Sequence, residues 1–181
     1  MYIDWLHDKS LSTDVGGDRN YARTEITMLL DAYILGDMIG DDCFYDAAMD
    51  TLIRVGQDHN RFLNSDQIKL IYESCGQGSM LRKLAVDQWE RTLKEFWESK
   101  VVGTLSKDFF TEMTRSLIAT RGDAKHFKHD REPWMLDPCA YHLHRKSGSA
   151  CFSTKTVQAE GLLAAESQDG GKQAKKRKRV S

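Results

Sequence analysis

The sequence predicts a mainly α fold, an array of about five amphipathic helices followed by a disordered C-terminal tail. The only two prolines, Pro133 and Pro138, lie late in the 181-residue chain, so the first 130 residues are free of the strongest helix breaker. Apolar residues in that stretch recur at the three-and-four spacing of one helix face. No alternating apolar run of convincing length indicates a β-strand.

The first two expected helices form a hairpin. Apolar side chains repeat along one face of residues 23–39, and Gly40 follows as a helix stop. Asp41 or Asp42 can then cap a second helix, whose apolar face covers residues 44–55 and which the next glycine would end. Because the connection is so short, the two helices are expected to pack against each other as a tight hairpin.

Three further helices are expected, joined by short polar segments. The first starts at Ser65 and ends before Gly76, and Ser79 opens a longer second helix. The third is capped by Ser106 and stopped by Gly122. With the hairpin, these helices make up the predicted array.

The charge is unevenly distributed along the chain. In total there are 26 lysines and arginines and 27 aspartates and glutamates, a net charge of −1. Six of the basic residues and none of the acidic ones lie in residues 172–181, which leaves residues 1–171 with 20 basic against 27 acidic residues, a net charge of −7. A broad nucleic-acid-binding surface needs excess positive charge and is therefore not expected on this acidic body. No run approaches the roughly 18 uncharged apolar residues of a membrane span, so no membrane partner is expected either.

The C-terminal tail carries a compact basic cluster. Beyond residue 153 the chain has too few apolar residues to form a core, which predicts disorder. The cluster resembles a monopartite nuclear import signal, so we expect an import receptor as a partner and the nucleus as the location, with the cytoplasm as the alternative. Non-specific nucleic-acid contact and a merely solubilising role are the other hypotheses. The cluster consists of Lys175, Lys176, Arg177, Lys178 and Arg179.

Four cysteine and histidine residues form a candidate zinc site near the two prolines. Zinc takes four such ligands in tetrahedral geometry, and a segment with little core of its own gains most from a metal clip. Ordinary packing of the segment, or its disorder, is the competing hypothesis, and His126 and His129 are substitute ligands. The set, spaced Cys-x2-His-x-His-x6-Cys, is Cys139, His142, His144 and Cys151.

Aromatic residues form wide stripes on two consecutive expected helices. Such residues are usually core, but a truncated domain would leave some of them uncovered, and an exposed apolar patch marks a partner-binding site or an aggregation liability. The residues of this candidate partner-binding surface are Trp89, Phe96, Trp97, Phe109 and Phe110.

No catalytic motif stands out, and an enzyme is not expected. Cys43 and Cys75 fall on expected helices beside apolar residues and are predicted to be buried, inert thiols. A catalytic cysteine would need a histidine partner in space, and the sequence nominates none.

Several phrases of the sequence, in order along roughly residues 1–151, resemble fungal BTB/POZ proteins. Residues 29–37 (LLDAYILGD) and 47–53 (AAMDTLI) resemble the closing helical pair of the BTB/POZ domain, which a Trp-Leu phrase like that at Trp5 precedes. Residues 78–89 (GSMLRKLAVDQW) and 133–144 (PWMLDPCAYHLH) resemble phrases downstream of that domain.

The resemblance implies a protein–protein interaction module without catalysis, in four parts. They are a partial BTB/POZ domain over residues 1–60, a helical extension over 61–121, a Pro/Cys/His segment over 122–153 and a disordered basic tail over 154–181. The first half of the family's domain has no counterpart here, so the chain is interpreted as a fragment, a truncated gene model or a diverged protein. That absence puts homodimerisation and docking to a cullin ubiquitin-ligase scaffold in doubt. The alternative hypothesis is a zinc-stabilised nuclear factor that contacts nucleic acid through the Cys/His segment and the basic tail.

Overall fold

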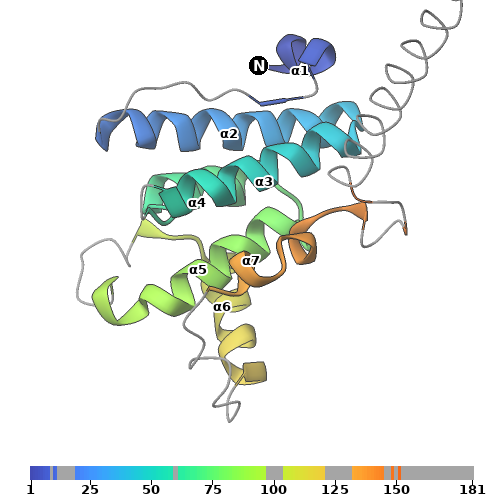
Figure 1. Ribbon diagram of the computed structural model, residues 1–181. Helices are drawn as coiled ribbons and strands as arrows, with labels where there is room; N and C mark the ends of the chain where they lie inside the picture. The colour runs from blue at the N-terminus through green and yellow to red at the C-terminus, as the bar shows by residue number, and fades with distance from the viewer. Residues whose placement is uncertain are drawn as a thin grey trace, which may run out of the picture.

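Every regular element in the computed structural model of the chain is a helix, within the residues that it describes (Figure 1). These residues are 1–8, 10–11, 19–58, 61–96, 104–120, 132–144, 148 and 151, without the side chains of 19–22 and 92–96. The predicted mainly α fold class is confirmed for them, and none of their helices has the length and apolar character of a membrane span. The elements are α1 (Tyr2–Asp8), α2 (Arg19–Ile39), α3 (Asp42–Asp58), α4 (Ser65–Ser74), α5 (Met80–Phe96), α6 (Lys107–Thr120), α7 (Pro133–Leu136) and the 3₁₀ helix η2 (Pro138–Tyr141).

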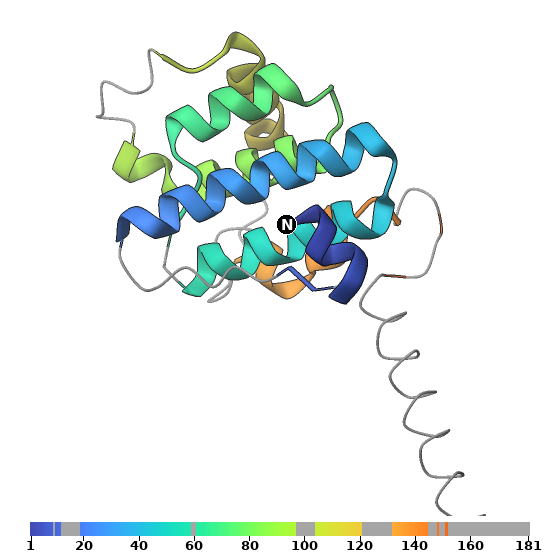
Figure 2. The same cartoon turned by 90° about the horizontal axis from the view of Figure 1, so that it is seen from above.

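Helices α2 and α3 form the predicted hairpin and lie side by side in Figures 1 and 2. Gly40 joins them in the left-handed conformation, with φ at 70°. The Asp41 amide donates a hydrogen bond of 3.1 Å to the Gly36 carbonyl oxygen, which closes the end of α2. The Asp41 side chain then caps α3 by accepting a hydrogen bond of 3.0 Å from the Phe44 amide.

Both helices of the hairpin are longer than the sequence predicted. Helix α2 begins at Arg19, and α3 continues through Gly56 to Asp58. A glycine inside a helix costs only about 1 kcal/mol, which the packing of the apolar face outweighs. The glycine is needed for a different reason, because a Cβ atom there would lie 3.0 Å from the carbonyl oxygen of Arg61.

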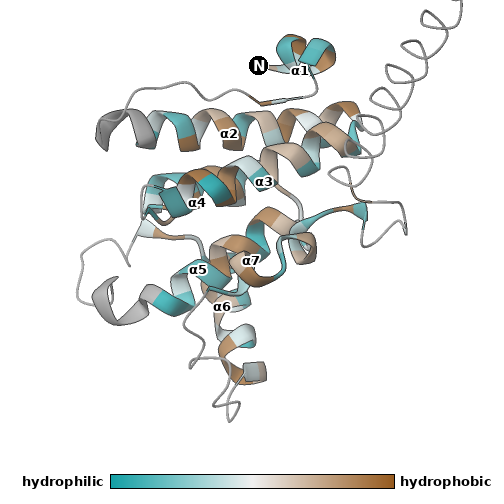
Figure 3. Cartoon of the chain, viewed as in Figure 1, coloured by the Kyte–Doolittle hydropathy of each residue, from teal (hydrophilic) through white to brown (hydrophobic). Residues whose placement is uncertain are grey.

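The remaining predicted helices begin where their caps indicated. Asn64 caps α4 in a capping box with Gln67, one residue before the predicted start at Ser65. The hydroxyl groups of Ser79 and Ser106 each accept a hydrogen bond of 3.2 Å from the backbone of the first turn of α5 and of α6. In Figure 3, apolar and polar residues share the surface of each helix, as amphipathic helices require.

Helix α1 is an element that the sequence analysis did not predict. Its Trp5 side chain is buried, with its ring 5.9 Å from that of Phe44 in α3. The Tyr2 ring meets Phe44 edge-on at 4.8 Å, and the Tyr2 hydroxyl donates a 3.4 Å hydrogen bond to Asp41. These contacts seat α1 over the junction between α2 and α3 (Figure 2).

The aromatic stripe proposed as a partner-binding surface is largely core where it is described. Trp89 and Phe109 are fully buried, with their rings edge-on at 5.4 Å, because α6 packs its apolar face against α5. Phe110 is half-buried beside them. The side chain of Phe96 and all of Trp97 lie outside the described residues. Trp89 and Phe109 are therefore not available to a partner in the folded chain.

Gly36 lets the two helices of the hairpin approach closely. A Cβ atom at this position would lie 3.0 Å from the Cα atom of Tyr45 in α3 and 3.2 Å from its Cβ atom. The Tyr45 ring is itself wedged against Tyr33, with their centroids 3.8 Å apart. Because the contact is with backbone, an added methyl group can be relieved only by separating the helices.

Gly36→Ala is expected to lower the free energy of unfolding by about 1–3 kcal/mol, because overpacking at this contact outweighs the higher helix propensity of alanine. Urea denaturation followed by far-ultraviolet circular dichroism measures the change. Gly76→Ala is the matched control, since a Cβ atom at Gly76 would meet no atom within 4 Å. Equal stability of Gly36→Ala and the wild type would contradict the close approach.

Candidate metal centre

The segment of residues 132–144 is held against α3 and α5 by two buried aromatic side chains. Trp134 in α7 packs edge-on against Phe62, with ring centroids 6.2 Å apart. The Tyr141 hydroxyl donates a hydrogen bond of 2.6 Å to Asp87, and the Lys83 ammonium lies 3.9 Å from the centre of the Tyr141 ring. These contacts fix the short helices that carry the candidate ligands.

The two prolines shape this segment. Pro133 opens α7 and Pro138 opens η2, the positions where a missing backbone N–H costs nothing. Each helix is only four residues long, so the chain reverses quickly and returns toward α3. Cys139 lies within η2, and His142 follows it directly.

The structure brings all four predicted ligands together. Their donor atoms lie within 4.8 Å of one another. The Cys139 and Cys151 sulfur atoms are 3.9 Å apart, and the Cys151 sulfur is 3.7 Å from Nδ1 of His142. The rings of His142 and His144 meet edge-on, with centroids 5.0 Å apart. This group, called the Cys/His cluster below, could hold a metal ion.

The measured distances agree with those of a tetrahedral site. With Zn–S bonds of about 2.3 Å and Zn–N bonds of about 2.0 Å, a tetrahedron separates two sulfurs by about 3.8 Å and a sulfur from a nitrogen by about 3.5 Å. The observed 3.9 Å and 3.7 Å differ from these separations by a few tenths of an ångström. These two separations fit a tetrahedral site, and the widest pair of donor atoms, within 4.8 Å, would have to close by up to about 1 Å.

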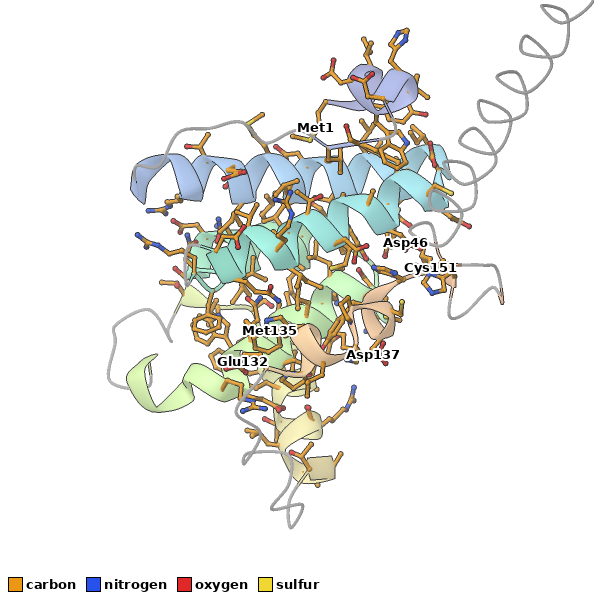
Figure 4. All side chains as sticks on the ribbon, in the orientation of Figure 1. Met1, Asp46, Glu132, Met135, Asp137 and Cys151 are labelled. Atoms are coloured by element: carbon orange, nitrogen blue, oxygen red, sulfur yellow. The ribbon has the colours of Figure 1, made fainter. Side chains whose placement is uncertain are left out.

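Two carboxylates of α3 orient the histidines of the cluster. Asp50 Oδ1 lies 2.7 Å from Nε2 of His142, and Asp46 Oδ2 lies 3.0 Å from Nδ1 of His144. Asp46 also accepts a hydrogen bond of 2.8 Å from the Leu143 amide through its other oxygen. In Figure 4, Asp46 and Cys151 lie close together, where the segment that carries the ligands reaches α3.

These hydrogen bonds decide which ring nitrogens are available. A carboxylate accepts the hydrogen bond of the nitrogen that it contacts, so Nδ1 of His142 and Nε2 of His144 are the ring nitrogens that a metal would use once they have lost their protons. The Nδ1 atom of His142 is the one that faces Cys151. Histidine ligands of metals ordinarily give their second nitrogen to a carboxylate in this way.

Burial and charge compete at His142, whose side chain is 1% exposed. Burial alone would lower the pKa of its ring. The hydrogen bond and charge of Asp50, aided by the charge of Asp46, outweigh burial and raise the pKa of His142 from 6.5 to about 9. At Cys139, burial and the neighbouring Cys151 raise the thiol pKa to about 11. His142 and Cys139 therefore hold their protons at neutral pH in the metal-free chain, and a metal would have to displace them.

The sequence analysis identified the four ligands but missed Asp46 and Asp50. Both acids lie on the helix that the sequence predicted, four residues apart and hence on one face. Their spacing beside the buried run of Ala47 and Ala48 was an available signal, since a carboxylate on a core-facing stretch needs a partner. The substitute ligands His126 and His129 and the basic cluster of residues 175–179 lie outside the described residues.

Comparisons of the chain with protein-family models, with curated proteins and with solved structures found no match. The similarity to fungal BTB/POZ proteins therefore remains a prediction from the sequence phrases.

Asp50→Asn is expected to lower the pKa of His142 from about 9, because burial is then opposed only by the charge of Asp46 and the contact with Cys151. In the metal-free wild type, the raised pKa of His142 contributes up to about 3 kcal/mol to the free energy of unfolding. This contribution is complete below pH 6.5 and is lost as the pH rises to 9. Urea denaturation below pH 6.5 and at pH 9 measures the change in the free energy of unfolding, and an NMR titration measures the pKa of His142. Asp58→Asn at the exposed end of α3 is the control. An unchanged pH dependence in Asp50→Asn would contradict the assignment.

Proposed function

We propose that the chain is a non-catalytic protein–protein interaction module whose Cys/His segment is closed by a structural zinc ion, called the zinc clip below. The observation that carries the zinc assignment is the convergence of four donor atoms within 4.8 Å, with two of the donors oriented by carboxylates of α3. The ligands would be Cys139, His142, His144 and Cys151.

The donor set favours zinc over other common ions. Two thiolates and two imidazoles suit Zn²⁺, whereas Mg²⁺ and Ca²⁺ prefer oxygen ligands. Four protein ligands complete a tetrahedral shell, so no position stays open for water or a substrate. The ion would therefore act structurally, which agrees with the expectation that the protein is not an enzyme.

Zinc would cross-link four residues within the range 139–151, and two carboxylates of α3 link this segment to a distant part of the chain. Asp50 and His142 are separated by 92 residues, and Asp46 and His144 by 98. Because the segment is held on α3, the free energy of zinc binding would also stabilise the packing of the segment on the body. The zinc clip would in this way fix the shape of the segment, while Asp46 and Asp50 hold it on α3.

Exposed apolar residues at one end of the molecule support an interaction function. Met38 is 78% exposed and Ile3 is 70% exposed, values unusual for such side chains when no partner covers them. The contact of Tyr2 with Asp41 places α1 beside the last turn of α2, so these residues share an end of the molecule. We call the group the α1–α2 patch; it consists of Ile3, Leu6, Leu35, Met38 and Ile39.

The resemblance to fungal BTB/POZ proteins supports the same function. Two of its phrases, residues 29–37 and 47–53, fall on the α2–α3 hairpin. The α1–α2 patch lies at the C-terminal end of α2, where the hairpin turns. The family implies docking through helix faces. In this proposal, α2 would contribute such a face at its C-terminal turn.

Charge argues against the alternative of a nucleic-acid-binding zinc factor. Residues 1–171 carry a net charge of −7. Zinc with two thiolates is neutral, and the adjacent Asp46 and Asp50 would leave the loaded cluster at about −2, which repels phosphate. For residues 175–179 we propose the role of a nuclear import signal, which addresses the module to the nucleus.

Purified protein is expected to contain one zinc ion per chain. Cys139→Ser and Cys151→Ser should each lose the metal and lower the thermal midpoint by about 10 °C, since a ligand at 1,000 times its dissociation constant contributes about 4 kcal/mol. Elemental analysis and thermal denaturation measure both quantities. Cys43→Ser on α3 is the matched control and should keep the metal. A metal-free wild-type protein with the same thermal midpoint after zinc addition would contradict the clip.

Met38→Glu combined with Ile39→Glu is expected to remove protein partners that proximity labelling of the wild-type chain enriches, because a charged α1–α2 patch no longer buries apolar area. Ile118→Glu on α6 is the matched control, since Ile118 is an equally apolar side chain that is 66% exposed. Circular dichroism should show both variants folded. Identical partner sets for the two variants would contradict a role for the patch.

A further inference from the structure

The two sulfur atoms of the Cys/His cluster are close enough to react with each other. Cys139 and Cys151 have their sulfurs 3.9 Å apart, and both residues are partly exposed. A disulfide bond is about 2.05 Å long, so the sulfurs must approach by about 1.9 Å. Of the other cysteines, Cys75 is buried in the core, where burial raises its thiol pKa.

Neither cysteine of the pair lies in one of the long helices that the structure describes. Cys139 lies in the four-residue helix η2, and Cys151 lies outside any regular element. Neither sulfur is fixed by packing inside a long helix, in contrast to Cys43 in α3. The body keeps its hold on the segment through Trp134 and Tyr141, which do not depend on the sulfurs.

We propose that Cys139 and Cys151 form a redox latch, in which a hydroperoxide converts the pair to a disulfide and releases the zinc ion. This inference rests on the proposed function, because it requires zinc in the cluster. The hydroperoxide is the oxidant, with hydrogen peroxide as its simplest form. The latch is closed with zinc bound and open with the disulfide formed.

The reaction balances in two steps. One thiolate attacks the O–O bond of hydrogen peroxide, which breaks to leave a sulfenic acid on that cysteine and a hydroxide ion. The second thiolate attacks the sulfenic sulfur, forming the S–S bond and expelling a second hydroxide. Two protons from solvent convert the hydroxides to two waters. The sulfurs supply the two electrons, and zinc leaves as Zn²⁺ without changing its oxidation state.

The remaining donors cannot retain the metal. A disulfide removes two of the four ligands, and His142 and His144 alone make a weak, incomplete site. Asp50 and Asp46 still hold both histidines against α3 after the metal leaves. Oxidation would therefore detach Cys151 from the histidines while the segment of residues 132–144 stays on the body.

The test treats the zinc-loaded full chain with hydrogen peroxide and follows zinc with a chelating dye, free thiols by titration and disulfides by peptide mapping. The expected result is zinc occupancy falling from one ion per chain to near zero together with the loss of two thiols, and a cross-linked peptide joining Cys139 to Cys151. A thiol reductant with added zinc should restore both. The double variant Cys43→Ser, Cys75→Ala should respond in the same way; if it fails to fold, the wild-type peptide map identifies the pair by itself.

The outcomes separate this inference from the proposed function. A chain that binds no zinc after reconstitution overturns the clip and the latch together. A chain that binds zinc but keeps it after peroxide treatment, or that forms sulfinic acids or bridges to Cys43 instead, overturns the latch and leaves the clip intact.

Discussion

Helix α3 connects the helical core to the Cys/His cluster. It packs on α2 along one side and presents two carboxylates to the cluster along another. Gly36 sets how near α2 lies to α3, and this spacing places the rest of the core. Asp46 and Asp50 extend from the same helix to hold His144 and His142. A shift of α3 would therefore change the core and the cluster together.

The buried carboxylate of Asp46 links the packing of the segment to the geometry of the cluster. Asp46 is 3% exposed, and a charge so far from water needs partners. In the metal-free chain those partners are the Leu143 amide and the imidazole of His144, and the same bond turns the other ring nitrogen toward the cluster. The contact between Asp46 and His144 thus has two effects. It gives the buried Asp46 carboxylate a partner, and it orients the ring of a candidate metal ligand.

Local signals carried most of what the sequence predicted. Helix starts followed from serine and aspartate residues, and the four candidate ligands followed from spacing within a short segment, since both depend on near neighbours. The parts that were missed depend on contacts across the fold. Trp5 of α1 packs against Phe44 of α3, and Asp50 contacts a histidine 92 residues away. The two residues of each of these contacts lie too far apart in the sequence for a local pattern to reveal them.

The long separation between α3 and its histidines has a consequence for biosynthesis. The hairpin can form as soon as residues 19–58 leave the ribosome, because its contacts are local. The cluster must wait until Cys151 has emerged, by which time the domain core is already in place. Metal loading would then be the last event in maturation, and a nascent chain stalled before residue 151 should be helical yet unable to retain zinc.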